Sequence, residues 1–217
     1  MKTLKGKKIT FISLNLFIFI SSAICFFLNI FIEIESGREM PFMFYFTTLS
    51  NIYAGIMALI LAIYSAYHFD DDNFKMNRVL KIFHLTSATS LALTFVTSVL
   101  FLTPMVIALG LPLSKIYGGY LILFHVINPI IHIITYMFFY KSSLRKLDIL
   151  YGIIPMGIYT IFYTIMVATH NMVDIYNFTF GGHLYMMAVM IPLMLGVTYL
   201  LSFLLFIVNR KFTKKYE

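Results

Sequence analysis

The chain has 217 residues, of which 60% are hydrophobic and 12% charged, including 23 Phe, 15 Tyr and 14 Met, a composition that excludes an ordinary soluble domain. Its net charge of +7 would suit a nucleic-acid-binding protein. The basic residues, however, lie in short segments between long apolar runs, which excludes that class and predicts an integral membrane protein.

Six apolar runs, each long enough to form a helix that crosses a bilayer, follow one another along the chain. They cover residues 9–32, 42–67, 82–103, 117–140, 149–169 and 184–208. Because the connections are short and no repeat is visible, we expect one all-α domain over residues 1–217, a polytopic bundle of six transmembrane helices. No run contains Lys, Arg, Asp or Glu, which argues against a buried ion pair or a proton-coupled pump.

The basic residues alternate along the chain in a way that sets its orientation. All of the 16 Lys and Arg except Arg38 and Lys115 lie near the termini or in the second and fourth connections. This positive-inside pattern predicts a multi-pass protein of the cell membrane with both termini in the cytoplasm. Anionic lipid headgroups, and no nucleic acid, are then the expected partners of the basic segments.

Polar residues open the second run. Thr47, Ser50 and Asn51 stand at i, i+3 and i+4, so on a helix they share one face and can present a nucleophile and hydrogen-bond donors to a single point. The alternative is close helix packing, because small residues continue this face along the helix. That stripe consists of Thr47, Asn51, Gly55, Ala58 and Ala62.

The acidic segment between the second and third runs contains Asp70, Asp71 and Asp72. Negative charge there can cap the start of the third helix, or it can bind a cation. Three adjacent acids lack the spaced ligands of a calcium loop, so we favour a solvated turn.

The fourth run carries His125, Asn128 and His132 on one face. Pro129 has no amide hydrogen, so we expect a bend that frees the carbonyl group of His125 for another partner. We interpret His132, deeper in the membrane, as a satisfied core histidine, and place His84 of the third run near the cytoplasmic interface.

Thr47 and His125 are expected at a similar depth, about two helical turns from the outer surface. There His125 can act as general base for a Thr47 nucleophile. Ser50, Asn51 or Asn128 can donate hydrogen bonds to the oxyanion. No carboxylate within the membrane is available to orient the imidazole.

The fifth run and the segment after it could complete a pocket. Tyr159 and Tyr163, one turn apart, can line a lipid-facing cavity or pack as ordinary aromatic residues. Residues 170–183 follow, and we expect either a structured lid or a plain loop containing His170, Asp174 and Tyr176. No His-Glu-x-x-His motif or cysteine pair occurs, so we expect neither a metal nor another cofactor.

Three groups of residues together resemble a known family. They are Tyr45-Phe46-Thr47 with Ser50-Asn51; His125 with Pro129; and Pro155, Tyr159 and Tyr163 followed by Tyr176 and Phe178. With them, the chain resembles the bacterial six-helix membrane proteins related to the androgen-induced-gene and androgen-dependent TFPI-regulating proteins. It departs from that family at Thr135-Tyr136 and near Met166.

The animal relatives in that family are threonine hydrolases that cleave fatty acid esters of hydroxy fatty acids. The resemblance therefore implies a hydrolase of lipid-like esters, with Thr47 and His125 as catalytic residues. Two alternatives remain: a non-enzymatic substrate-binding membrane subunit, such as that of an energy-coupling-factor transporter, and a structural membrane protein.

Overall fold

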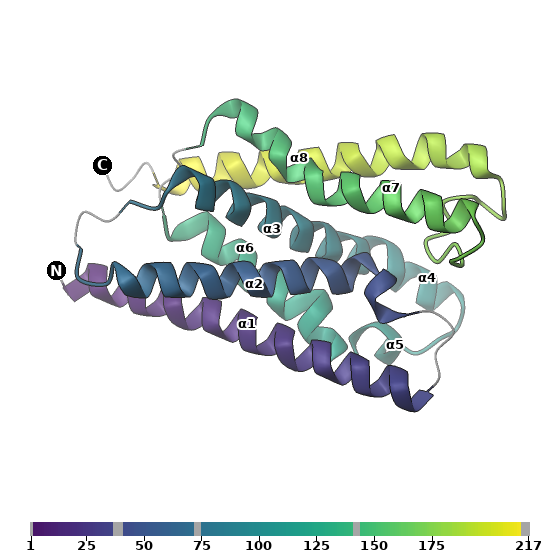
Figure 1. Ribbon diagram of the computed structural model, residues 1–217, viewed down its shortest axis with the longest axis horizontal. Helices are drawn as coiled ribbons and strands as arrows, with labels where there is room; N and C mark the ends of the chain where they lie inside the picture. The colour runs from purple at the N-terminus through teal and green to yellow at the C-terminus, as the bar shows by residue number, and fades with distance from the viewer. Residues whose placement is uncertain (1, 37–40, 72–74, 141–143, 214–217) are drawn as a thin grey trace.

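The structure is a computed structural model that describes residues 2–36, 41–71, 75–140 and 144–213. Most of these residues are helical and none of them belongs to a β-strand, which confirms the predicted all-α class. The helices lie side by side in an elongated bundle (Figure 1). The start of α1 (Lys2–Ser36) and the end of α8 (Met187–Thr213) lie at the same end of the bundle, which we call the terminal end.

The first two long helices, α1 and α2 (Phe46–Tyr67), run antiparallel along the bundle (Figure 1). They approach closely at Gly55, where an added Cβ atom would lie 2.8 Å from the Cβ atom of Ser22. At the terminal end, the ammonium group of Lys8 donates hydrogen bonds to three backbone carbonyl groups between residues 68 and 71. These bonds satisfy carbonyl groups at and beyond the end of α2.

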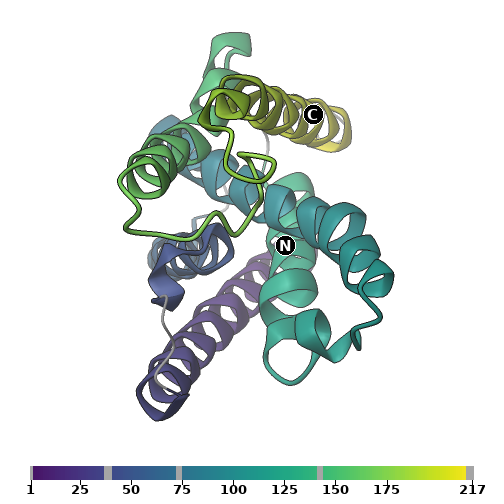
Figure 2. The same ribbon diagram turned by 90° about the vertical axis from the view of Figure 1, so that its right-hand side faces the viewer.

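Helix α3 (Arg78–Thr97) lies between the α1–α2 pair and the α7–α8 pair (Figures 1 and 2). Every residue from 84 to 94 is buried, and the small side chains among them let the neighbouring helices approach. Asn77 caps the start of α3, since its Oδ1 accepts a hydrogen bond of 2.8 Å from the amide of Val79.

The acidic segment does not provide this cap, and its described residues Asp70 and Asp71 are exposed, as expected of a solvated turn. Asp70 instead forms an ion pair of 2.8 Å with Lys5 of α1. Asp72 lies outside the described residues. The amide oxygen of Asn77 takes the capping role because it stands directly before the first turn.

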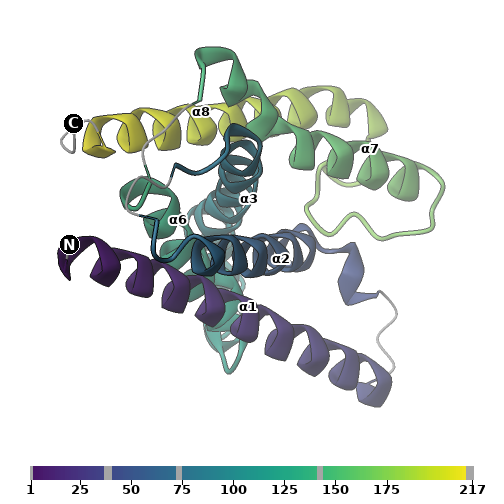
Figure 3. The same cartoon turned by 60° about the vertical axis from the view of Figure 1, so that its left-hand side comes forward.

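The third predicted span is longer than expected and the fourth is shorter. Helix α3 continues through a π-helical turn, η2 (Ser98–Leu102), into α4 (Thr103–Ala108). After α5 (Ser114–Tyr117), a second π-helical turn, η3 (Leu123–Ile127), leads into α6 (Asn128–Phe138). The expected helix 117–140 is interrupted near its start because Gly118 is extended and Gly119 has a φ of 56°. Helix α6 packs against α1 and α3 (Figure 3).

The last third of the chain begins with a 3₁₀-helix, η4 (Lys146–Ile153), that leads into α7 (Ile154–Ala168). A loop and a short 3₁₀ turn, η5 (Leu184–Met186), connect α7 to α8. Asp148 of η4 is buried and accepts hydrogen bonds from Arg78 at 2.6 and 3.0 Å. The carboxylate lies one residue before the predicted run 149–169, and the ion pair is only half-buried because the side chain of Arg78 is 41% exposed.

Among the described residues, five helices are long and apolar enough to cross a membrane. They are Lys5–Glu35, Phe46–Tyr67, Arg78–Ala108, Lys146–Ala168 and Leu184–Phe212. The remaining apolar helix joins the five residues of η3 to the eleven of α6. Those residues span roughly 24 Å at a rise of 1.5 Å per residue, less than the hydrocarbon core of about 30 Å. Large apolar side chains also cover the outer faces of the long helices, as lipid contact requires. The chain is therefore a helical membrane protein.

Candidate functional site

Thr47 lies in the first turn of α2 and is partly buried. Its carbonyl oxygen accepts two side-chain hydrogen bonds from its own helix, one from Ser50 Oγ at 3.0 Å and one from Asn51 Nδ2 at 2.8 Å. Ser50 Oγ also lies 2.8 Å from Thr94 Oγ1 of α3. The polar groups predicted as oxyanion donors thus bond to backbone and to a neighbouring helix.

Asn51 and Asn128 join three helices at the buried centre of this region. The side chain of Asn51 donates to the carbonyl groups of Thr47 and Phe124, and its Oδ1 accepts a bond of 3.2 Å from Asn128 Nδ2. Asn128 also bonds to α1, where Ser21 Oγ donates to its Oδ1 at 2.6 Å and Ser22 Oγ accepts from its Nδ2 at 3.2 Å. This group ties α1, α2 and α6 together through paired buried polar atoms.

The expected bend at Pro129 takes the form of the π-helical turn η3. There the amide of Asn128 bonds to the carbonyl of Leu123, five residues earlier. In a π-helical register, the amide of residue 129 would donate to the carbonyl of Phe124, but Pro129 has no amide hydrogen. The Phe124 carbonyl accordingly accepts its hydrogen bond from Asn51, at 3.1 Å. Our prediction that the His125 carbonyl would be the freed one assumed an α-helical register and missed the extra residue in the turn.

His125 is held by the short hairpin that precedes η3. Its Nδ1 lies 2.6 Å from the carbonyl oxygen of Ile116, and the edge of its ring faces Tyr117, with ring centroids 6.4 Å apart. Because a carbonyl group only accepts, Nδ1 carries the hydrogen, and Nε2 of the neutral ring has a lone pair. His125 Nε2 is therefore available as a base, and no hydrogen bond within the described residues occupies it.

Asn51 holds the turns that carry Thr47 and His125 against each other, since it bonds to the carbonyl of Thr47 and to that of Phe124, the residue before His125. The two side chains themselves are not hydrogen-bonded in the described part of the chain. The imidazole of His125 instead bonds to the Ile116 carbonyl. The arrangement offers a partly exposed hydroxyl and a base on adjacent helices, without a preformed dyad.

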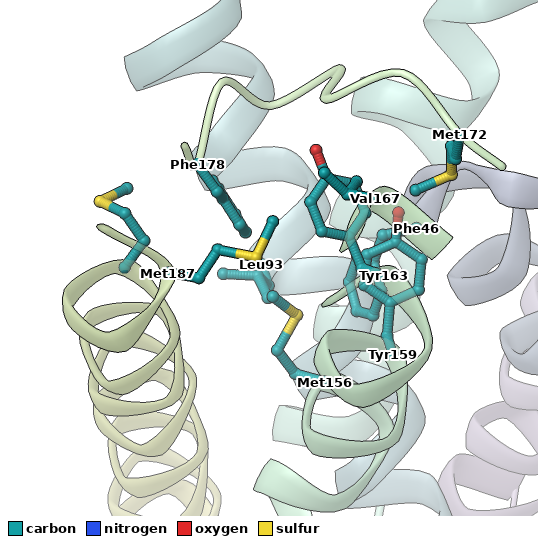
Figure 4. Packing of buried hydrophobic residues seen from close by; sticks show 10 residues of the cluster. Phe46, Leu93, Met156, Tyr159, Tyr163, Val167, Met172, Phe178 and Met187 are labelled. Atoms are coloured by element: carbon teal, nitrogen blue, oxygen red, sulfur yellow. The ribbon is translucent and has the colours of Figure 1, made fainter. Parts of the chain in front are cut away.

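Tyr159, Tyr163 and Tyr176 attach α7 and the following loop to the start of α2. Tyr159 OH donates to the carbonyl of Phe44 at 2.8 Å, and Tyr176 OH accepts from the amide of Phe46 at 3.2 Å. The rings of Tyr159 and Tyr163 lie beside Phe46 in one buried cluster (Figure 4). The partly buried ring of Tyr176 packs against this cluster. These residues form packed aromatic contacts next to Thr47.

The segment expected to be a lid is folded around Asp174. This carboxylate accepts hydrogen bonds from Tyr163 OH, from the amide of Phe178 at 2.9 Å and from the amide of Thr179 at 2.7 Å. Although desolvation raises the pKa of Asp174, the hydrogen bonds outweigh it, and the pKa lies below the usual value of an aspartate. Asp174 therefore organises the loop.

His170, which was also considered for the lid, is exposed and has a φ of 58°. It follows the C-terminal end of α7, where the amide of Asn171 bonds back to the carbonyl of Met166. Left-handed backbone is common at helix ends. His170 therefore belongs to the turn that ends α7, and no interaction links it to His125 in the described structure.

A second hydroxyl–imidazole pair lies deeper in the bundle. Ser87 Oγ is 2.8 Å from His132 Nε2, and His84 Nε2 is 3.3 Å from Thr135 Oγ1. Both histidines are buried, and His132 Nδ1 has no hydrogen-bond partner. The expectation of a fully satisfied His132 is therefore wrong for that nitrogen.

Sequence reasoning identified the polar face of α6 but not its pairing with hydroxyl and imidazole groups of α3. The signal was present, because both helices carry a histidine near hydroxyl residues. What the sequence lacked was the information that α6 packs directly on α3. Since the Ser87–His132 pair is buried on all sides, a substrate cannot reach it without rearrangement of the bundle.

Within the described residues, no group of three or more His, Cys, Asp or Glu side chains could hold a metal ion. No family model matches the chain, and no curated protein or solved structure matches it either.

Proposed function

We propose that the chain is a multi-pass membrane protein with six spans and both termini in the cytoplasm. The helix Leu123–Phe138, fourth in chain order, is then also a membrane span. The preceding turn, which contains α5 (Ser114–Tyr117), completes its crossing of the bilayer. This proposal is supported by the position of the start of α1 and the end of α8 at the same end of the bundle (Figure 1). An even number of crossings returns the chain to the side where it began, and the alternating basic residues assign that side to the cytoplasm.

Labelling of single cysteines tests this topology. In a Cys25→Ser background, a cysteine at the exposed position Val173 should react with a membrane-impermeant maleimide in intact cells. A cysteine at exposed Lys75 should react only after the cells are opened. Labelling of both positions on the same side would contradict the six-span topology.

We further propose that the protein is a hydrolase of lipid-like esters in which Thr47 is the nucleophile and His125 the general base. One observation carries this proposal: Asn51 ties the Thr47 turn to the turn before His125, while Ile116 holds the proton on His125 Nδ1. Thr47 is partly buried in the first turn of α2, and no hydrogen bond within the described residues occupies His125 Nε2. A substrate bound between the two turns completes the dyad.

In the proposed reaction, Thr47 Oγ1 attacks the ester carbonyl carbon and passes its proton to His125 Nε2. The tetrahedral intermediate collapses, the carbon–oxygen bond to the alcohol breaks, and His125 returns the proton to the departing alcohol. Water then attacks the acyl-Thr47 ester and gives a proton to His125. Release of the fatty acid, with return of that proton to Thr47, restores the resting enzyme.

A non-enzymatic role, as a structural or substrate-binding membrane subunit, is the alternative. It is favoured by the hydrogen bonds of Ser50, Asn51 and Asn128, all of which join helices or satisfy backbone. In that case Thr47 contributes only to the packing of α2. Copurification with an ATPase partner would favour a transport subunit.

The two functions differ in their reaction with a long-chain alkyl fluorophosphonate, which forms a phosphorus–oxygen bond to an activated hydroxyl and releases fluoride. The purified protein should be labelled, Thr47→Val should not, and His125→Ala should react at least about a hundredfold more slowly. Thr48→Val and Ser87→Ala are matched controls that remove a neighbouring hydroxyl and the hydroxyl of the buried pair. Equal labelling of wild type and Thr47→Val would refute the hydrolase.

A further inference from the structure

A groove of about 710 Å³ lies between η4 and α8, at the terminal end of the bundle and away from Thr47 and His125. Its apolar walls come from both elements and include Leu147, Leu150, Tyr199, Phe203, Phe206 and Ile207. Several of these side chains are strongly exposed, Leu147 by 76% and Leu150 by 52%. The volume of the groove is typical of a binding site for a small organic ligand.

The shape of the groove follows from the crossing of η4 and α8. The two elements touch at Gly152, where an added Cβ atom would lie 2.6 Å from the Cβ atom of Ser202. Ser202 Oγ also donates a hydrogen bond of 2.8 Å to the carbonyl of Ile149. The groove lies beside this contact and is lined by Lys146 of η4 and Arg210 of α8. A 3₁₀-helix of eight residues is unusually long, so its backbone is held in this form by the contact.

The mouth of the groove is basic. Lys146, Arg210 and Lys211 line it and are exposed, and none of the three forms an ion pair with a carboxylate in the described part of the chain. The nearby carboxylate of Asp148 is already paired with Arg78. The groove therefore combines apolar walls with a positive charge that lacks an internal counterion.

We propose that this groove binds an anionic phospholipid of the surrounding bilayer. One acyl chain lies along the apolar walls between η4 and α8, and the phosphate group contacts Lys146, Arg210 and Lys211. Both walls belong to helices that are apolar enough to lie in the membrane, so lipid reaches the groove directly. The charge at the mouth selects an anionic headgroup over a zwitterionic one, because no carboxylate among the described residues pairs with these cations.

Native mass spectrometry of the purified full chain tests this proposal with equal amounts of dioleoyl phosphatidylglycerol and dioleoyl phosphatidylcholine. Wild type should retain phosphatidylglycerol preferentially. Since each basic residue near the headgroup contributes about fivefold to binding, Arg210→Gln/Lys211→Gln should lower that preference about 25-fold. The matched control Lys7→Gln/Lys75→Gln removes the same charge from exposed positions outside the groove and should leave the preference within about twofold.

A second variant tests the apolar part of the site. Ile207→Trp fills the groove without changing charge and should reduce retention of phosphatidylglycerol although the basic residues remain. An equal loss of preference in the two double variants would overturn the proposal, because attraction would then depend on overall charge. Undiminished retention in Ile207→Trp, or a dimer in wild type that this variant abolishes, would also overturn it.

Discussion

Gly152 is a position where a single methyl group should destabilise the bundle. In Gly152→Ala the new Cβ atom would lie 2.2 Å from Ser202 Oγ, 2.6 Å from Ser202 Cβ and 3.2 Å from Thr89 Oγ1. The Ser202 hydroxyl could rotate away, but its Cβ atom is fixed to the backbone of α8. Helix α8 and η4 must therefore separate by roughly an ångström to restore ordinary contact.

The expected cost has three parts. Overpacking of a dense interior costs about 1–3 kcal/mol, and loss of the hydrogen bond from Ser202 to Ile149 costs about 1 kcal/mol. Replacing glycine by alanine restricts the unfolded chain and returns about 0.5–1 kcal/mol. The free energy of unfolding should thus fall by about 2 kcal/mol.

Unfolding of the detergent-solubilised protein by sodium dodecyl sulfate, followed by circular dichroism, measures this change. Gly157→Ala is the matched control on α7, because an added Cβ atom there meets nothing within 4 Å, and it should be neutral or stabilising. Ser202→Gly should recover part of the loss in Gly152→Ala. If Gly152→Ala unfolds like wild type, the close contact does not limit stability and the reasoning fails.

Three further predictions concern other contacts. Asp174 has a lowered pKa in the folded protein, so its full contribution to loop stability is present above its unfolded pKa of about 3.9 and is lost as pH falls through the lower folded pKa. Hydrogen exchange in residues 170–183 should become faster in that pH range. In Tyr163→Phe, which lacks one hydrogen bond to the carboxylate, the same increase should occur at a higher pH. Arg78→Gln should lower the melting temperature because it leaves the buried Asp148 carboxylate without its cation, and adding Asp148→Asn should restore part of that loss. Asn51→Leu should lower the free energy of unfolding by about 2–4 kcal/mol, since it removes hydrogen bonds to the Phe124 carbonyl and from the Asn128 side-chain amide. If the losses in Asn51→Leu and Asn128→Leu add up in the double variant, the two side chains are not coupled and this prediction fails.

Apolar run length could predict most of the fold, because helices in lipid must satisfy their own backbone groups and so need long uncharged segments. The limits of the prediction appear where the chain leaves regular helix. Gly119 shortens the fourth span, and Asp148 enters the fifth because Arg78 neutralises it. The conformation of Gly119 and the pairing of Asp148 with Arg78 cannot be predicted from the length of one apolar run.

The candidate site could likewise be predicted only in part from the sequence. Spacing on one helix correctly grouped Thr47, Ser50 and Asn51 on the buried side of α2, but it could not show which group each side chain would bond to. Asn51 bonds to Phe124, 73 positions away in sequence. The π-helical register of η3, which creates that acceptor, depends on packing as well as on Pro129. Contacts between helices thus decide the chemistry that a polar face can perform.

The two π-helical turns explain why the interior polar groups cluster where they do. Each turn ends two residues before a proline, η2 before Pro104 and η3 before Pro129, and each has a carbonyl that accepts a hydrogen bond from a distant side chain. The Ser98 carbonyl of η2 accepts the amide of Thr103 and also the hydroxyl of Tyr117 at 3.2 Å. The Phe124 carbonyl of η3, which Pro129 leaves without an amide donor, accepts from Asn51. Irregular backbone is stable inside a bilayer only when protein groups pair it. Tyr117 also contacts the His125 ring, so a side chain that donates to η2 lies against the proposed base as well.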